Sequence, residues 1–375
     1  MSDDIKLLKL KNNSNAQNKF RTFWSANPFK IYSHIPKLYE WYMGKDVYPI
    51  SIEIGITSQC NHNCCFCSVK PKHIDRNSYL SEDVLNQFVS NAKEMDVRSV
   101  VVSGSGEQTL HPFFSEFLKK LKNAGIYIGL NTNGSMLTES LCRIIIESVT
   151  WIRVSLDASS EIVRKSVHGV KDLHKATEGL RKLVALKKKT QSQLSIGTQM
   201  VVCPENGEEI ESCTQLSHSL GVDYQQIKPV IPFDLYYPYR KGKKKEMKEW
   251  LRRIKTVAKN FSENELMVNV RYDQFNDYIN GTNLREEAHL PCLITFSPYI
   301  EADGKVWFCV DKKGYDDYYL GDMNKVSLKT IWHSERRKEV LDYVKKNTCG
   351  HICRNSPLNE FLFEMKNPSP FYYFL

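Results

Sequence analysis

Residues 50–67 read ISIEIGITSQCNHNCCFC, and the rest of the chain is interpreted outward from this stretch. Its first part, ISIEIGIT, alternates between apolar and other side chains and is rich in isoleucine, which predicts a β-strand. Three cysteines follow the strand directly, Cys60, Cys64 and Cys67, with the spacing C-x3-C-x2-C. Thiolates are preferred ligands of iron–sulfur clusters, and this spacing lets one loop bind three corners of a cubane. The fourth iron of a 4Fe–4S cube then stays open to an exogenous molecule.

Metal binding is the favoured interpretation of the eleven cysteines of the chain. Their number is odd, and the start MSDDIKLLKL carries acidic residues where a secretion signal would be basic, so disulfides are not expected. Zinc is the alternative metal, because closely spaced thiols also suit zinc, and His62 or Cys65 could supply its fourth ligand. We expect instead that His62 and Asn63 shape the loop and that Cys65 is a packed thiol.

Beyond this loop, short β-branched or apolar runs alternate with longer amphipathic stretches, which is typical of β-α units around a parallel sheet. The predicted strands are residues 50–57, 98–104, 126–132, 151–157, 194–202 and 222–229. We therefore predict an α/β fold whose main domain is a partial (β/α)6 TIM-like barrel. In parallel α/β architectures the site lies at the carboxyl ends of the strands, so the residues that follow each strand are the candidates for function.

The remaining segments divide the chain around this barrel domain, residues 50–229. Residues 1–49 form an N-terminal extension, and residues 230–288 are predicted to be a helical linker whose basic run is a solvated helix face. Residues 289–355 form a small domain with a β-hairpin, because Asp303-Gly304 is a strong turn signal between two alternating runs. The apolar tail, residues 356–375, is expected to pack back on the body.

The first-strand motif carries a family resemblance. C-x3-C-x-Phe-C at the end of the first strand of a (β/α)6 pattern resembles the radical S-adenosylmethionine (SAM) superfamily over about residues 50–229. The resemblance implies that a 4Fe–4S cluster held by Cys60, Cys64 and Cys67 binds SAM at its open iron. Electron transfer from the reduced cluster then gives methionine and a 5'-deoxyadenosyl radical, which removes a hydrogen atom from a substrate C–H bond. It also implies a flavodoxin- or ferredoxin-type electron donor.

The resemblance extends to the ends of the later strands. Residues 104–107, Gly-Ser-Gly-Glu, resemble the Gly-Gly-Glu element that holds the methionine amino group, although Ser105 replaces a glycine and Gln108 stands where proline is usual. Residues 131–134, Asn-Thr-Asn-Gly, resemble the Thr-Asn-Gly turn of the family, and residues 155–157 the position that meets the ribose. The SAM contacts that the resemblance implies are Phe66, Gly104, Ser105, Gly106, Glu107, Thr132, Asn133, Ser155, Asp157 and Val202, the last against the adenine.

Five further residues are candidates for binding or catalysis. Arg153 and Arg164 could hold the SAM carboxylate or a substrate phosphate through a bidentate fork, with ordinary surface positions as the alternative. Cys203 follows the fifth strand, where a thiol could return a hydrogen atom to a substrate radical, as an epimerase requires; a buried inert thiol is the alternative. A dehydrogenase needs a general base instead, and Lys228 and Glu53 are candidates unless they are salt-bridge partners.

A second set of cysteines lies near the C-terminus. Cys292, Cys309, Cys349 and Cys353 resemble the ligands of the twitch type of auxiliary-cluster domain, a shortened relative of the SPASM domain. Four thiolates would ligate a second 4Fe–4S cluster completely, with His351 as a substitute ligand, and such a cluster can take up the electron left after hydrogen abstraction. A structural zinc is the alternative, because four thiolates suit both metals.

Composition limits the remaining possibilities. The 375 residues are 41% hydrophobic and 25% charged, which excludes a disordered or low-complexity protein, and the net charge of +9 permits a phosphorylated substrate. No apolar run is long enough to span a bilayer, so we expect a cytoplasmic protein with no membrane and no nucleic-acid partner.

Three functional hypotheses follow from these patterns. The first is hydrogen abstraction from a polar small molecule, such as a sugar, an aminocyclitol or a nucleotide-linked sugar, that leads to oxidation, epimerisation or dehydration. The second is modification of a ribosomally made peptide or a protein side chain. The third is a non-catalytic zinc or nucleic-acid binding module, whose affinity would depend on charge and fall steeply with salt.

Overall fold

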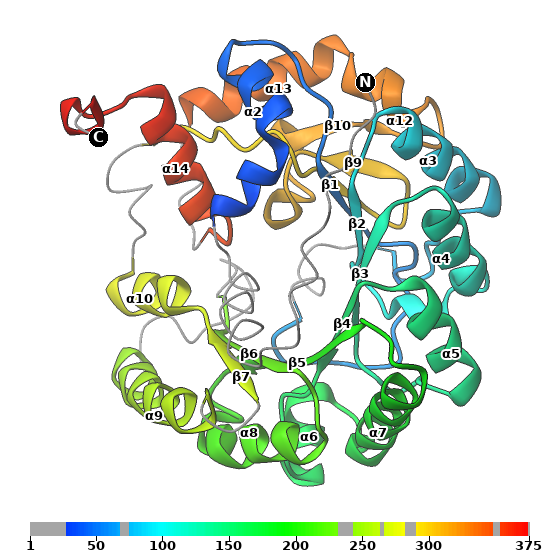
Figure 1. Cartoon of the computed structure of the whole chain (residues 1–375), viewed down its shortest axis with the longest axis vertical. Helices are drawn as coiled ribbons and strands as arrows, with labels where there is room; N and C mark the ends of the chain where they lie inside the picture. Colours follow the sequence, from blue (N-terminus) through cyan, green and yellow to red (C-terminus); the bar gives the residue numbers. More distant parts are fainter. Residues whose placement is uncertain are drawn as a thin grey trace, which may run out of the picture.

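The computed structural model describes residues 28–67, 75–231, 243–262, 266–281, 290–347 and 353–373. Within these residues the strands form one sheet in the order β10-β9-β8-β1-β2-β3-β4-β5-β6-β7. The sheet curves into an open barrel, and the helices α3 to α9 lie around its outside (Figure 1). The predicted α/β class and the TIM-like arrangement are confirmed.

The parallel strands of the barrel include all six that the sequence predicts. Their bounds are β1 (Ser51–Ile54), β2 (Ser99–Val102), β3 (Tyr127–Thr132), β4 (Trp151–Ser155), β5 (Ser195–Val202), β6 (Tyr224–Pro229) and β7 (Met267–Val270). The helices around them are α3 (Glu82–Glu94), α4 (Phe114–Asn123), α5 (Glu139–Ser148), α6 (Glu161–His168), α7 (Leu173–Thr190), α8 (Ile210–Ser219), α9 (Lys244–Ser262) and α10 (Tyr272–Asn280).

Side chains along each strand alternate between the hydrophobic core under the outer helices and the interior of the barrel. Ile52 and Ile54 of β1 are fully buried against the outer helices, while Glu53 between them faces inward and stays partly accessible. Strand β4 repeats the pattern, with Ile152 buried and Arg153 in the interior. Successive side chains of a strand point to opposite faces, so inward residues of neighbouring strands converge on one space.

The region 230–288, expected to be a helical linker, contains a strand as well. Its described residues form α9, β7 and α10, and β7 pairs in parallel with β6. The basic run lies mainly on α9, which nevertheless buries Trp250 and Ile254 against the barrel core. Four residues of strand between helices are too short a signal for periodicity to detect.

The C-terminal region extends the barrel sheet. Strands β8 (Tyr299–Ile300) and β9 (Lys305–Trp307) form the predicted hairpin, and Gly304 in its turn has φ +85°. Strand β10 (Tyr319–Asp322) pairs with β9, while β8 pairs in parallel with β1. The hairpin therefore brings the second cysteine region to the edge of the barrel.

Terminal segments cover the same edge. They comprise the 3-10 helix η2 (Pro28–His34), α2 (Ile35–Tyr42), α12 (Leu328–Trp332), α13 (Glu335–Lys346) and α14 (Ser356–Lys366). The ring of Phe361 on α14 packs edge-on against Tyr32, so the tail returns to the body as expected.

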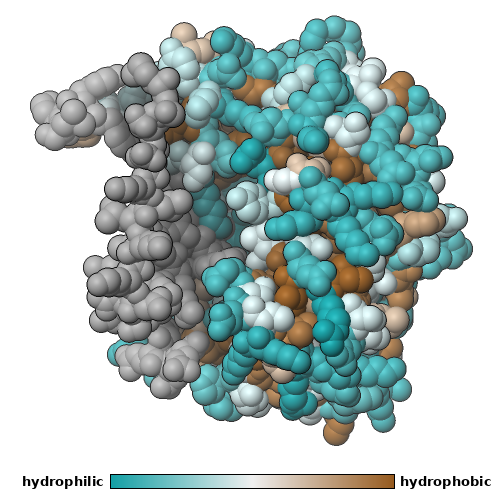
Figure 2. Space-filling model, turned by 45° about the vertical axis from the view of Figure 1, so that its right-hand side comes forward, coloured by the Kyte–Doolittle hydropathy of each residue, from teal (hydrophilic) through white to brown (hydrophobic). Residues whose placement is uncertain are grey.

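The face that Figure 2 shows is mainly hydrophilic. Teal side chains dominate the face in Figure 2, and hydrophobic residues lie scattered among them. Among the described helices, none has the length and apolar character that a membrane span requires.

Candidate functional site

The three cysteines that follow β1 lie on one loop, which we call the cysteine loop (residues 60–67). Burial raises the pKa of the Cys64 thiol, and the neighbouring Cys67 raises it further, so these sulfurs face a shared space. The described groups of ligand atoms within 4.8 Å of one another do not include the trio Cys60, Cys64 and Cys67. The group on this loop that lies within 4.8 Å joins Cys64 with His62 and His168, and Cys64 Sγ lies 3.3 Å from His168 Nδ1. The loop therefore offers a set of three thiols and a mixed set of one thiol and two imidazoles.

The end of α6 anchors the cysteine loop. The backbone N–H of Asn63 donates to the carbonyl of His168 at 2.9 Å, and that of Cys65 donates to Val167 at 2.8 Å. Gly169 follows with φ +76°, and a Cβ there would lie 3.0 Å from the Asn63 carbonyl oxygen. A glycine at this left-handed position thus ends the helix and leaves room for the loop.

A buried charge network fixes the loop from behind. His62 Nε2 lies 2.8 Å from Asp172 Oδ2, and Arg164 Nε donates to Asp172 Oδ1 at 3.0 Å. Burial opposes ionisation of Asp172, but the His62 hydrogen bond and the Arg164 charge outweigh it and hold the pKa of that carboxyl below its usual range. The guanidinium also donates to the backbone oxygens of Ser155 (2.9 Å) and Asn133 (3.3 Å). Arg164, expected as a ligand of a carboxylate or phosphate, instead joins the ends of β3 and β4.

Glu107 joins the turns after β2 and β3 to the cysteine loop. The carboxylate is buried and accepts from Thr132 Oγ1 at 2.6 Å, from Thr109 Oγ1 at 2.6 Å and from the Asn133 N–H at 2.7 Å. The Asn133 amide then donates to Asn61 Oδ1 at 2.8 Å. Among the described donors, Oε2 accepts only the Asn133 N–H. The carboxylate is therefore held in place with capacity left for an amino group.

The turn that carries Glu107 approaches the backbone after β1 closely. A Cβ on Gly106 would lie 2.3 Å from the Gln59 carbonyl oxygen, and one on Gly104 would lie 2.4 Å from the Cα of Gly55. Distances this short leave no space for a side chain, so the expected glycines are needed for the two loops to meet.

Gln108 is a positioning residue that the sequence analysis noted only as a departure from proline. Its side chain is fully buried, and Oε1 accepts from the Ile56 N–H at 2.6 Å. Its Nε2 donates to the carbonyls of Gly106 (2.9 Å) and Thr57 (3.2 Å). The amide thus satisfies backbone groups that the turn leaves unpaired, which a single sequence without structure cannot reveal.

Ser105 ties the same turn to the C-terminal region. Its hydroxyl donates to Glu301 Oε2 at 2.5 Å and accepts from Lys313 Nζ at 2.9 Å. All three side chains are buried, and the Lys313 ammonium lies 5.0 Å from the centre of the Tyr299 ring. Where the resemblance expects a glycine, this chain therefore has a hydroxyl that connects the turn after β2 to the segments that follow β8 and β9.

Two other expected SAM contacts are committed within the protein. Asp157 is fully buried, its Oδ1 accepts from the Val201 N–H at 2.5 Å, and its Oδ2 lies 3.0 Å from His168 Nε2. Val202 is buried in the cluster between β5 and the outer helices. The ring of Phe66 lies edge-on to His168, with centroids 6.3 Å apart. Of these residues, Phe66 alone lies on the cysteine loop itself.

Cys203 is fully buried and lies beside Cys65 and Glu205, with ligand atoms within 4.8 Å of one another. Hydrogen bonding to Cys65, and then burial, raises the pKa of the Cys203 thiol strongly. Cys203 is therefore packed against Cys65, which the sequence analysis expected to be a packed thiol.

The second cysteine set is partly described. Burial raises the pKa of Cys309, and Asp311 and Cys353 raise it further, so the thiols of Cys309 and Cys353 lie near each other. Cys292 is buried, and its N–H donates to the backbone of α13. The remaining predicted ligands lie outside the described residues: Cys349 and His351.

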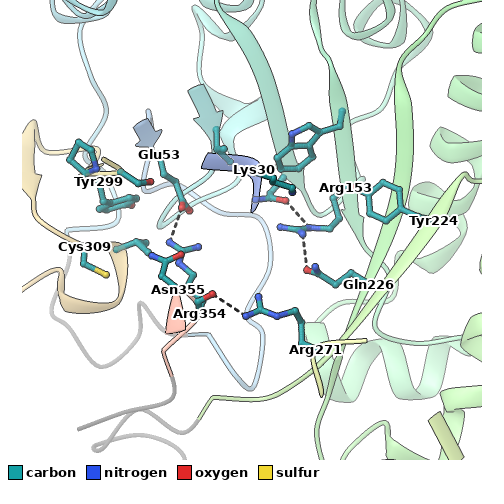
Figure 3. A pocket seen from close by; sticks show the side chains of 16 residues that line it. Lys30, Glu53, Arg153, Tyr224, Gln226, Arg271, Tyr299, Cys309, Arg354 and Asn355 are labelled. Carbon is teal, nitrogen blue, oxygen red and sulfur yellow. Dashed lines mark hydrogen bonds and ion pairs between the residues drawn. The ribbon is translucent and has the colours of Figure 1, made fainter. Parts of the chain in front are cut away.

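A cavity of about 350 Å³ lies inside the barrel next to this second set (Figure 3). Glu53, Arg153 and Gln226 face it from β1, β4 and β6, and Cys309 and Arg354 face it from the C-terminal region. Arg354 donates to Glu53 Oε2 at 2.7 Å. The structure thus gathers inward strand residues and a predicted cluster ligand around one space.

Neither Lys228 nor Cys203 belongs to the described wall of this cavity, but Lys228 lies near enough to the wall residues Arg153 and Arg354 for their charges to act on it. Burial, and after it the charge of Arg153, lowers the pKa of Lys228 to about 8. Of the three predicted catalytic residues, Glu53 therefore lines the cavity, and Lys228 lies near residues of its wall.

Two family models match the chain. Residues 54–216 match the radical SAM superfamily, and residues 292–356 match SPASM, an iron-sulfur cluster-binding domain. The second match overlaps the segment predicted to hold an auxiliary cluster.

Curated relatives include two kinds of protein. The chain is 24% identical over 334 residues to the tungsten-containing aldehyde ferredoxin oxidoreductase cofactor-modifying protein of Pyrococcus furiosus, across 82% of this chain and 87% of that protein. It is 29% identical over 173 residues to the probable GTP 3',8-cyclase of Saccharolobus islandicus, across 46% of this chain and 54% of that protein. The chain therefore spans about half the length of the cyclase.

Solved structures share the fold. SuiB of Streptococcus suis bound to the precursor peptide SuiA aligns with a TM-score of 0.65 at 15% identity, across 92% of this chain and 75% of that one. Native anSMEcpe with bound AdoMet aligns with a TM-score of 0.60 at 18% identity, across 85% of this chain and 97% of that one.

The buried network predicts that Arg164 is needed for stability. Arg164→Met leaves His62 as the remaining described partner of the Asp172 carboxylate and leaves two backbone oxygens without their donor, so we expect the free energy of unfolding to fall by roughly 3–5 kcal/mol in urea denaturation. Arg252→Met, at an exposed position of α9, is the matched control and should change it by less than about 0.5 kcal/mol. Equal losses in both variants would contradict the anchoring role.

The link through Ser105 predicts a smaller effect. Ser105→Ala leaves buried Glu301 and Lys313 without the shared hydroxyl, so we expect a loss of about 1–3 kcal/mol in the same measurement. Ser103→Ala is the control on the same segment, because no described hydrogen bond involves its side chain. A loss in the control as large as that of Ser105→Ala would show that the hydroxyl bridge is not the cause.

Proposed function

Because the chain belongs to the radical SAM superfamily and carries a SPASM-type iron–sulfur domain, we propose that it abstracts a hydrogen atom from a small molecule held in the barrel cavity. The observation that carries this proposal is the cavity itself, with inward strand residues on one side and Cys309 on the other. When bound, the clusters and SAM supply the radical chemistry and the electron acceptor. The cysteine loop would hold the first cluster, and Glu107 would orient the methionine amino group.

The position of the cavity supports a substrate site below the strand-end residues. Arg153 faces the cavity, and Ser155, an expected SAM contact, lies two residues later on the same face of β4. Two residues of strand span roughly 7 Å. A molecule in the cavity would thus lie directly beneath SAM held at the strand ends.

Size and polarity favour a metabolite over a peptide. A volume of about 350 Å³ lies in the range of small-molecule sites, and the wall carries polar groups from the barrel strands and from the C-terminal region. The relative that covers most of this chain is named as a cofactor-modifying protein, and the other as a GTP cyclase. Both names support a small molecule as substrate.

We favour oxidation among the three outcomes considered. Cys309 in the cavity wall would place the auxiliary cluster beside the substrate, where an electron can leave it. Glu53 faces the cavity from β1, where Arg354 holds its carboxylate at 2.7 Å, and it would accept the proton that leaves with that electron.

Metal content tests the two clusters. Anaerobically reconstituted protein should hold about eight irons with matching sulfide, as two cubanes require. Cys309→Ala should fall to about four irons, while Cys142→Ala, a buried thiol of α5, should keep the full number. Zinc without sulfide in the wild-type protein would contradict the enzyme proposal, and full iron in Cys309→Ala would remove that residue as a ligand.

Substrate-dependent SAM cleavage tests the reaction. We expect nucleotides or sugar phosphates to raise the rate of 5'-deoxyadenosine formation by reduced enzyme at least tenfold over the substrate-free rate. Glu53→Gln should lose this stimulation, and Glu116→Gln, at an exposed position of α4, should keep it. Stimulation by peptides and not by small molecules would replace the proposal with peptide modification.

A further inference from the structure

The cavity wall carries an excess of positive charge. Its charged side chains in the described residues are Lys30, Glu53, Arg153, Arg271 and Arg354. Two of the arginines have carboxylate partners, because Arg354 pairs with Glu53 at 2.7 Å and Arg271 pairs with Asp273 at 2.6 Å. Neither Arg153 nor Lys30 has a carboxylate within 4.0 Å among the described residues, and of these two cations Arg153 is half-buried whereas Lys30 is exposed.

Neutral groups orient the Arg153 guanidinium into the cavity. Its Nε donates to Asn131 Oδ1 at 3.1 Å and its Nη1 donates to Gln226 Oε1 at 2.7 Å (Figure 3). The Trp151 ring lies 5.4 Å away and restricts it further. An arginine has five N–H donors, so these two bonds leave three without a described acceptor. The side chain is thus fixed in place while its charge is not neutralised.

A glycine makes this arrangement possible. Arg153 on β4 reaches Gln226 on β6 across the intervening strand, where its register partner is Gly197 of β5. A Cβ at Gly197 would lie 2.2 Å from the Tyr224 ring. The strand between the two residues therefore contributes no side chain that could separate them.

Lys228 adds a second cation on the same face of β6, two residues after Gln226. The effect of the Arg153 charge on the pKa of Lys228 shows that the two groups are near each other. Within the described part of the chain, Lys228 has no carboxylate partner. Both side chains are half-buried, and their like charges repel each other, so an anionic ligand that contacts both is favoured.

We propose that Arg153 and Lys228 form a binding site for a phosphate group of the substrate. This inference rests on the proposed function and names the class of molecule that the cavity takes. A phosphate monoester carries a charge of about −1.5 to −2 at pH 7, which matches two cations, whereas a carboxylate carries a single charge. The free donors of Arg153 suit the bidentate geometry of arginine and phosphate. Of the two roles considered for Arg153 from the sequence, this assigns the phosphate and not the SAM carboxylate.

Direct binding of inorganic phosphate tests the site without turnover. Calorimetric titration of the SAM-loaded holoenzyme at low salt should show phosphate binding at least tenfold tighter than acetate. Arg153→Gln and Lys228→Met should each weaken phosphate binding at least tenfold, and Arg252→Gln on the exposed face of α9 should leave it unchanged. Two variants at different strands keep the test valid if one of them fails to fold.

Other outcomes separate this inference from the proposed function. Phosphate binding that survives both variants, or acetate binding as tight as phosphate, would overturn the phosphate site. A fall in SAM affinity in Arg153→Gln with intact phosphate binding would assign that residue to the SAM carboxylate and overturn it too. A third outcome combines two results: phosphate binding depends on both residues, but no phosphorylated small molecule stimulates SAM cleavage. It would support the phosphate site and count against the proposed function.

Discussion

The buried contact of Arg164 with Asp172 is the interaction on which the site depends. Asp172 also holds His62 of the cysteine loop, and Arg164 also holds the backbone at the ends of β3 and β4. A loop that leaves one iron of a cubane open cannot rely on a fourth thiolate to fix its shape, so the protein must fix it. The network does this from beside Cys64, because His62 also lies 3.4 Å from His168, which contacts the Cys64 sulfur.

Hydrogen bonds join the two cysteine regions into one unit. Strand β8 continues the barrel sheet beyond β1, and Ser105 connects the turn after β2 to Glu301 and Lys313. The C-terminal region is therefore attached at the place where SAM is expected and not at a distant surface. Because Cys309 also lines the interior cavity, residues of the barrel and of the C-terminal region together form the wall of that cavity.

The sequence predicted those features that depend on residues close together in the chain. Alternation located six strands, and the spacing of the cysteines after the first strand indicated the chemistry. Contacts between residues that are distant in sequence could not be predicted in this way. Arg164 lies next to the expected site in sequence, but its guanidinium turns to backbone oxygens that folding brings near. Gln108 departs from a familiar motif, and the structure alone shows which backbone groups it satisfies. Strand β7 is too short to have a detectable period.

The strand order begins with β10 and ends with β7, and no described pairing joins these two. In a closed barrel the number of strands and their stagger set the diameter. A sheet with two free edges is not bound by this relation. Its diameter can change while each strand keeps the neighbours with which it pairs. Shifts of the edge strands can thus change the size of the cavity for a different substrate, while the strand ends and the cysteine loop keep their positions.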